Sequence, residues 1–228
     1  MKDPALTSLL AACISFVGSH FVLSHPLRAP LIGKLGEKGF LGLYSLVSLA
    51  TFAWMVLAFR AAWGTGAPLW NGMADLPWAI ASAITLVALV LFIGSLRGNP
   101  ALPDTPAATV SAAKVHGVFA ITRHPMMWGF ALWGFAHILV MPTARSFVLA
   151  GAIIVLALLG AHLQDRKKAA ALGTAWNNWT AQTSYWPRWS RLPAAGIGLW
   201  LVALILWLGI TWLHKPANGF AAGIWHWL

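Results

Sequence analysis

Charged residues, and acidic residues above all, are scarce in this sequence. Only 9% of the 228 residues are charged and only five are Asp or Glu, whereas a soluble chain carries about 25% charged residues. None of the five carboxylates lies in the middle of an apolar run. A membrane protease or a proton relay built on paired carboxylates is therefore unsupported, and so is an ordinary soluble domain.

Cysteine and the common catalytic motifs are also missing. The single cysteine, Cys13, lies in the first apolar run, which excludes an internal disulfide, a C-x-x-C redox pair and a C-x-x-C-H haem attachment. There is no G-x-S-x-G for an α/β-hydrolase and no H-E-x-x-H for a zinc protease.

Long apolar runs make up most of the chain. Hydrophobic residues account for 59% of it, and 15 tryptophans fit a membrane protein because Trp anchors at bilayer interfaces. The sequence predicts an all-α, polytopic membrane helical bundle with about six spans and interfacial helices, forming a single domain over residues 1–228. The first run is expected to be retained. Residues 26–42 are expected to form a glycine-rich surface turn, and residues 164–187 a surface helix. The predicted spans are 5–24, 42–62, 77–96, 125–142, 144–163 and 196–214.

The basic residues predict the orientation. The net charge is +10, but the cations lie in the connections between spans, so they favour membrane topology over nucleic-acid binding. One side of the predicted bundle holds Lys2, Arg60, Arg145 and Lys215. The other side holds Arg28, Lys34, Lys38, Arg97, Lys114, Arg123, Arg166, Lys167, Lys168, Arg188 and Arg191. The positive-inside rule then predicts a bacterial inner-membrane protein with both termini in the periplasm.

Histidines are the ionisable groups left inside the predicted spans: His20, His137 and, near the end of its span, His162. Imidazole can be an axial ligand of haem iron between two facing helices, or it can simply bond to a neighbouring helix. At about 1.5 Å per residue, His137 lies roughly 18 Å into its span and His20 about 6–10 Å from the end of its own. On depth alone, His20 matches His124 or His162 better than His137.

A second group of polar residues is expected at the membrane surface. Arg123 and His124 precede Pro125 at the start of a span, and Asp165 lies at the end of the next. Together they predict a cationic site at the cytoplasmic mouth of the bundle. The alternative is that Arg123 only anchors to lipid phosphates.

Three stretches resemble a known family. They are LGEKGFLGLYSLVSL, ITRHPMMWGFALWGFAH and GAHLQDRKKAAALGTAWNNWTAQTSYWP, and they resemble the NnrU family and the related plant and cyanobacterial 15-cis-zeta-carotene isomerases. The resemblance covers nearly the whole chain. The RHP stretch alone is less specific, because isoprenylcysteine and phospholipid methyltransferases have a similar one.

The resemblance implies a cofactor and a reaction. It implies a non-covalent haem b with His20 and His137 as the axial ligands, and cis–trans isomerisation of a lipid-soluble polyene that enters from the bilayer. His162 joins Arg123, His124 and Asp165 around the cofactor site in this reading. A cysteine found three residues before the second histidine in the isomerases is Gly134 here, so a switch of iron ligands through that thiol is not expected.

Two other functions remain open from the sequence. The first is a non-catalytic, haem- or nitric-oxide-linked membrane factor associated with denitrification, to which the family name points. The second is a methyltransferase that uses S-adenosylmethionine at the RHP site, with Arg123, His124 and residues 164–187 holding the cofactor.

Overall fold

The computed structural model describes residues 3–102, 105–219 and 221–228, and every regular element within these ranges is a helix. Five helices are long and apolar enough to cross a membrane, and a sixth is apolar but shorter. The predicted polytopic helical bundle is therefore confirmed. The six helices are α1 (Pro4–Ser24), α2 (Arg28–Ala61), α3 (Asp75–Gly94), α5 (Pro125–Val140), α6 (Ala144–Leu172) and α8 (Ile197–Trp212).

Short elements connect and cover the long helices. They are α4 (Ala107–Ala112), η1 (Gly117–Ala120), α7 (Thr174–Gln182), η2 (Trp189–Ala195), α9 (His214–Asn218) and η3 (Gly223–Trp227). Among them, η3 folds back onto the bundle, because Trp78 Nε1 donates to the Gly223 carbonyl at 2.8 Å and Trp227 Nε1 donates to Asp75 Oδ1 at 2.9 Å. The C-terminal tryptophans thus tie the tail to α3.

One predicted connection was wrong, and one predicted span ends later than expected. The glycine-rich stretch before residue 42 is helical, because α2 already begins at Arg28 and only bends at Gly36, where φ is 70° and ψ is 171°. That backbone conformation is essentially restricted to glycine. At the other boundary, α6 continues to Leu172 instead of ending near residue 163. Helix formation persists there after the apolar run ends, because alanines and basic residues are good helix formers.

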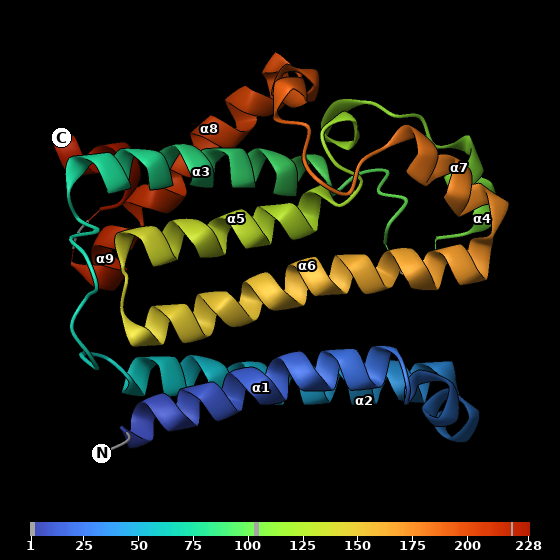
Figure 1. The fold of residues 1–228 in the computed structure, drawn as a ribbon, viewed down its shortest axis with the longest axis horizontal. Coiled ribbons are helices and arrows are strands. Elements are labelled where there is room, and N and C mark those ends of the chain that lie inside the picture. Colours follow the sequence, from blue (N-terminus) through green and yellow to red (C-terminus); the bar gives the residue numbers. More distant parts are fainter. Residues whose placement is uncertain (1–2, 103–104, 220) are drawn as a thin grey trace.

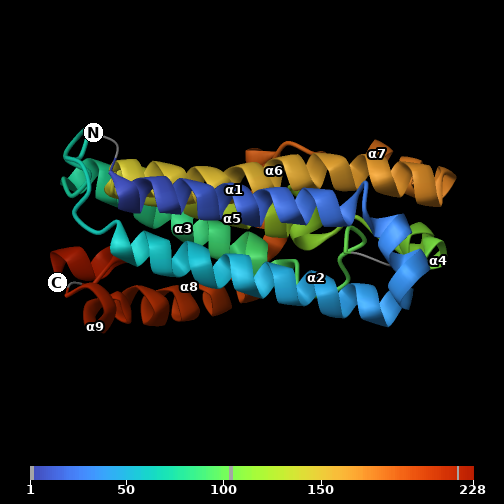
Figure 2. The same cartoon turned by 90° about the horizontal axis from the view of Figure 1, so that it is seen from below.

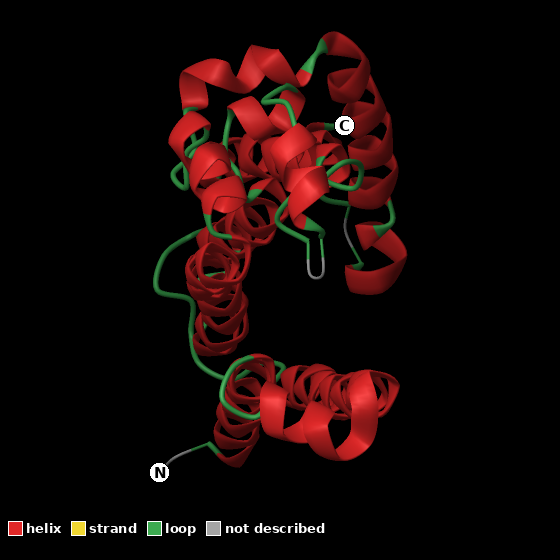
Figure 3. Ribbon diagram, turned by 90° about the vertical axis from the view of Figure 1, so that its right-hand side faces the viewer, coloured by secondary structure: helices red, strands yellow, loops and turns green. Residues whose placement is uncertain are grey.

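The six long helices form a single curved row. Neighbours along the row are α2 and α1, α1 and α6, α6 and α5, α5 and α3, and α3 and α8. Figures 1 and 2 show these helices running nearly parallel to one long axis, with both chain termini at the same end. Figure 3, viewed nearly along the helices, shows that the row bends into an open arc. Helices α2 and α8 are its two ends.

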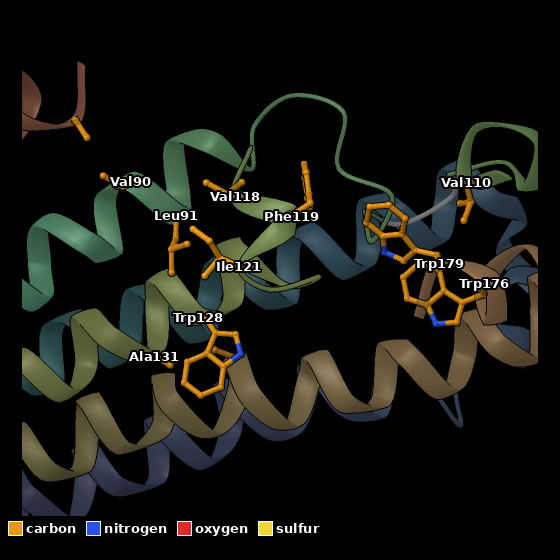
Figure 4. Close-up of a cluster of buried hydrophobic side chains, with 12 residues drawn as sticks. Val90, Leu91, Val110, Val118, Phe119, Ile121, Trp128, Ala131, Trp176 and Trp179 are labelled. Atoms are coloured by element: carbon orange, nitrogen blue, oxygen red, sulfur yellow. The ribbon is translucent and has the colours of Figure 1, made fainter. Parts of the chain in front are cut away.

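We call the end of the bundle with the two termini the terminal end, and the opposite end, where α4 and α7 lie, the basic end. Lys2, one of the cations predicted on the terminal side, lies outside the described residues. A cluster of buried apolar side chains seals the basic end (Figure 4). Trp176 and Trp179 of α7 are 1% and 2% exposed there, and Phe119 of η1 packs against Trp179.

Two glycines let α5 approach its neighbours closely. A Cβ atom added at Gly129 would lie 2.9 Å from the Ala88 carbonyl oxygen of α3. A Cβ at Gly134 would lie 2.8 Å from the Ile154 side chain and 3.2 Å from the Ala150 carbonyl oxygen of α6. Small residues at helix contacts are the usual means of close packing in membranes. Helix α5 is therefore fixed at the centre of the row.

Candidate functional site

The polar residues predicted at the basic end do come together. Asp165 of α6 accepts hydrogen bonds from Arg123 Nε at 2.8 Å and from Arg123 Nη2 through the same carboxylate oxygen. Its other oxygen accepts from His124 Nε2 at 2.7 Å. The side chains of Arg123 and Asp165 are each 14% exposed and that of His124 is 2% exposed. This ion-pair cluster joins the start of α5 to α6.

The segment around Tyr185 closes over this cluster. Arg123 N donates to the Ser184 carbonyl and Trp128 Nε1 to the Tyr185 carbonyl, at 2.8 and 2.9 Å. Burial raises the pKa of the Tyr185 phenol above its usual value, and the Asp165 carboxylate raises it further, while Arg123 acts in the opposite direction. The phenol therefore stays protonated and donates to the Leu158 carbonyl at 2.6 Å.

His162 lies beside the cluster and is not part of it. It lines an open cleft of about 540 Å³ at the basic end with Arg123, Tyr185 and Trp186. Its side chain is exposed. The nearby carboxylate, Asp165, is already bonded to Arg123 and His124 and does not serve as a charged partner for a ligand in this cleft. Aromatic side chains form much of the cleft wall.

His20 is held between α1 and α2. Its Nδ1 lies 2.7 Å from the Phe16 carbonyl oxygen. The imidazole also packs on the ring of Phe16 and against the edge of Tyr44, at centroid distances of 4.4 and 5.5 Å. His20 therefore has the surroundings of a helix-packing residue.

His137 lies in a different place, in the wall of a large apolar cavity. The cavity measures about 550 Å³ and lies on the concave side of the row, from the terminal end to the middle of the bundle. Its walls come from α3, α5, α6 and α8, with the last turn of α2 and the tail contributing at the terminal end. No acidic side chain is among the described residues that line it.

The imidazole of His137 has a defined tautomer. Its Nδ1 lies 2.7 Å from the Trp133 carbonyl oxygen, which can only accept, so Nδ1 carries the proton. The Trp133 ring packs on the imidazole at a centroid distance of 4.0 Å. The lone pair of the neutral ring is then on Nε2. His20 and His214 make the same contact with a carbonyl oxygen one turn back, so what distinguishes His137 from His20 is its place in the cavity wall.

A haem held by both His20 and His137 does not fit this arrangement. Phe21, next to His20, lies at the level of Gly160 of α6, whereas Gly134, one turn before His137, lies at Ala150 and Ile154. Because α6 rises about 1.5 Å per residue, Gly160 and Ala150 are about 15 Å apart along the bundle. Metal–imidazole bonds are about 2 Å long, so two ligands of one ion must be about 4 Å apart. Of the two, His137 is the one that would hold a haem in the cavity, because it lies in the cavity wall.

Two other cavity residues were not singled out from the sequence. His214 of α9 lines the same cavity as His137. Arg145 of α6 also lines it and is only 5% exposed. Arg145 directly follows MPTA, a connection too short to place its side chain in water. This feature of the sequence could have identified Arg145 as a buried cation.

Gly134 does not face the cavity. It lies against α6, where an added side chain would collide with Ile154. The position at which the isomerases carry a cysteine thus serves helix packing in this chain.

The fold and the cavity define a class of protein: a polytopic helical membrane protein with an apolar cavity among its helices. A family model, described as NnrU protein, matches residues 8–222. The chain therefore belongs to the NnrU family. A search of curated proteins found no match, and a search of solved structures found none either.

Proposed function

We propose that this protein binds an elongated, lipid-soluble polyene in the apolar cavity and isomerises one of its double bonds. The observation that carries the proposal is the cavity itself, about 550 Å³ in volume and walled by aromatic and aliphatic side chains. Ligand sites are typically apolar clefts of about 300–1,000 Å³ with a few polar groups that fix orientation. Here those groups are His137, His214, Arg145 and the hydroxyls of Ser82 and Thr85.

The ligand would reach the cavity from the bilayer. Residues of α2 and α8, the two ends of the curved row, both line it. The outer faces of these helices carry exposed apolar side chains such as Leu49, Leu57 and Ile205, which suit contact with lipid. A substrate dissolved in lipid could therefore pass between α2 and α8 without crossing water.

Haem b is part of this proposal, with His137 as its protein ligand. Support comes from the position of His137 in the cavity wall, with Nε2 left for a metal, and from Arg145, a buried cation in the same cavity that could pair with a propionate. A haem bound through one histidine would supply iron with an open coordination position, able to polarise a double bond as a Lewis acid. His137 would hold it, and the aromatic walls would exclude water.

The methyltransferase reading is less well supported. Arg123 Nε and Nη2 and His124 Nε2 all bond to Asp165, so these donors are not left for a cofactor carboxylate. We assign this cluster to positioning: it fixes the start of α5 and hence the cavity wall. We also propose that the basic end faces the cytoplasm of the bacterial inner membrane, because lysine and arginine gather there.

The test compares two variants of adjacent residues on α3. Ser82 lines the cavity, whereas its neighbour Ala83 is exposed on the helix surface. We expect Ser82→Phe to fill the cavity and to lower polyene binding at least tenfold in nanodiscs, while Ala83→Phe binds like the wild type. Conversion of cis to trans polyene, followed by chromatography, should fall in parallel. Equal binding by both variants would contradict the proposed site, and binding without conversion by the haem-loaded wild type would favour the non-catalytic alternative.

A further inference from the structure

Arg145 is a buried cation in a cavity that offers it no anion. The residue is 5% exposed, and within the described part of the chain the buried Nη1 of its guanidinium has no hydrogen-bond partner. Leaving a charged donor unsatisfied away from water costs free energy. Neither His137 nor His214, its titratable neighbours in the cavity, can supply a negative charge.

Two aromatic rings, one from the last turn of α2 and one from the turn that follows it, hold the guanidinium in place. It lies 4.6 Å from the ring centroid of Phe59 and 4.1 Å from that of Trp63. Such contacts use the flat faces of a guanidinium and leave the in-plane N–H groups available. In-plane donors in a fork are the geometry that binds a carboxylate with two parallel hydrogen bonds.

The backbone adds positive potential at the same point. Arg145 is in the first turn of α6, a helix of 29 residues whose N-cap, Thr143, makes no side-chain capping bond. The first N–H groups of a helix lack partners within it, and the helix dipole is positive there. An anion next to Arg145 would therefore meet the amino end of α6 as well.

We propose that Arg145 binds the carboxylate of an amphipathic ligand whose apolar body lies in the cavity. This inference rests on the proposed function, since it assigns the head group of the molecule that the cavity takes. The carboxylate would lie at the terminal end of the bundle, beside Ser146 and His214, with the apolar body extending toward Phe92 and Phe130. Such a carboxylate could belong to a polyene acid or to a haem propionate.

The experiment compares acids with their methyl esters, because an ester keeps the apolar body and removes the charge. Binding of a long-chain polyene acid and its methyl ester, and of haem and haem dimethyl ester, is measured by native mass spectrometry of the full chain. We expect the wild type to bind at least one of the two acids about tenfold more tightly than its ester. The pair that shows the preference identifies the source of the carboxylate.

Two variants make the result specific to Arg145. Arg145→Gln should lose the preference for the acid but still bind the ester, which shows that the cavity is intact. Arg60→Gln, an exposed arginine near the same end of α2, should behave as the wild type. Equal binding of acid and ester by the wild type, or an acid preference that survives in Arg145→Gln, would overturn this inference alone. Failure of the wild type to bind any acid or ester would instead overturn the cavity function on which it rests.

Discussion

Asp165 is the residue on which the basic end depends. It neutralises Arg123 and accepts from His124, and all three side chains are at least 86% buried from solvent. Removing one partner of a buried ion pair leaves an uncompensated charge, which typically costs about 3–5 kcal/mol. We expect Asp165→Asn to lower the free energy of unfolding by about that amount, measured by denaturant titration in detergent.

The matched control is Glu37→Gln, which removes the same charge from an exposed position of α2. A surface substitution of this kind should change the free energy of unfolding by less than about 0.5 kcal/mol. If the two variants unfold alike, the ion-pair cluster does not stabilise the bundle.

For single residues, the sequence predicted where in the bundle a residue lies better than it predicted which residues it contacts. The positions of Arg123, His124 and Asp165 at span ends were enough to predict that they share one mouth, and their proximity is now seen. The role of Arg145 was missed, because a cation at a span end is usually an anchor, and burial depends on which helix packs over it. That helix is α2, which supplies Phe59, and the turn after it supplies Trp63.

Among the helices, α5 determines how closely the row packs. We expect Gly129→Ala to lower the free energy of unfolding by about 1–3 kcal/mol, because its methyl group would press on the Ala88 carbonyl and push α5 away from α3. Gly151→Ala is the control. It lies within α6 with no atom within 4 Å of the added Cβ, so it should be neutral or slightly stabilising, since alanine favours helices. Equal losses in both variants would show that the α3–α5 contact is not tight.

Apolar run length predicted the existence of the six long helices, but glycine content misled the prediction for α2. A glycine in a connection and a glycine that bends a helix look the same in one sequence. Gly36 adopts a conformation open to glycine alone, while the backbone on both sides of it remains helical. Only the packing of the two segments distinguishes a kink from a turn.

The orientation of the whole molecule remains a prediction, and cysteine labelling tests it. In a Cys13→Ala background, Ala67→Cys would place a thiol in the exposed connection between α2 and α3 at the terminal end. Ala171→Cys would place one on the exposed last turn of α6 at the basic end. A maleimide that cannot cross membranes should label the first in intact spheroplasts and the second only after permeabilisation. The reverse pattern would contradict the positive-inside assignment.

The order of the helices across the row could not be predicted from the sequence. Helices joined by short connections, such as α5 and α6, must be neighbours, but the contact of α1 with α6 links segments more than 100 residues apart. That contact fixes the position of α1 along the length of α6. It therefore keeps His20 far from His137. The depth mismatch read from the sequence therefore persists in the fold.

The visible absorption spectrum of the purified protein, from cells supplied with haem, tests the central claim most directly. We expect the wild type and His20→Ala to show the same Soret band and His137→Ala to lose it, because His137 lies in the cavity wall and His20 does not. His25→Ala, at an exposed histidine beyond the end of α1, should match the wild type. A wild type without a Soret band, or a band that survives in His137→Ala, would contradict the account. Loss of the band in His20→Ala would show instead that both histidines hold the haem.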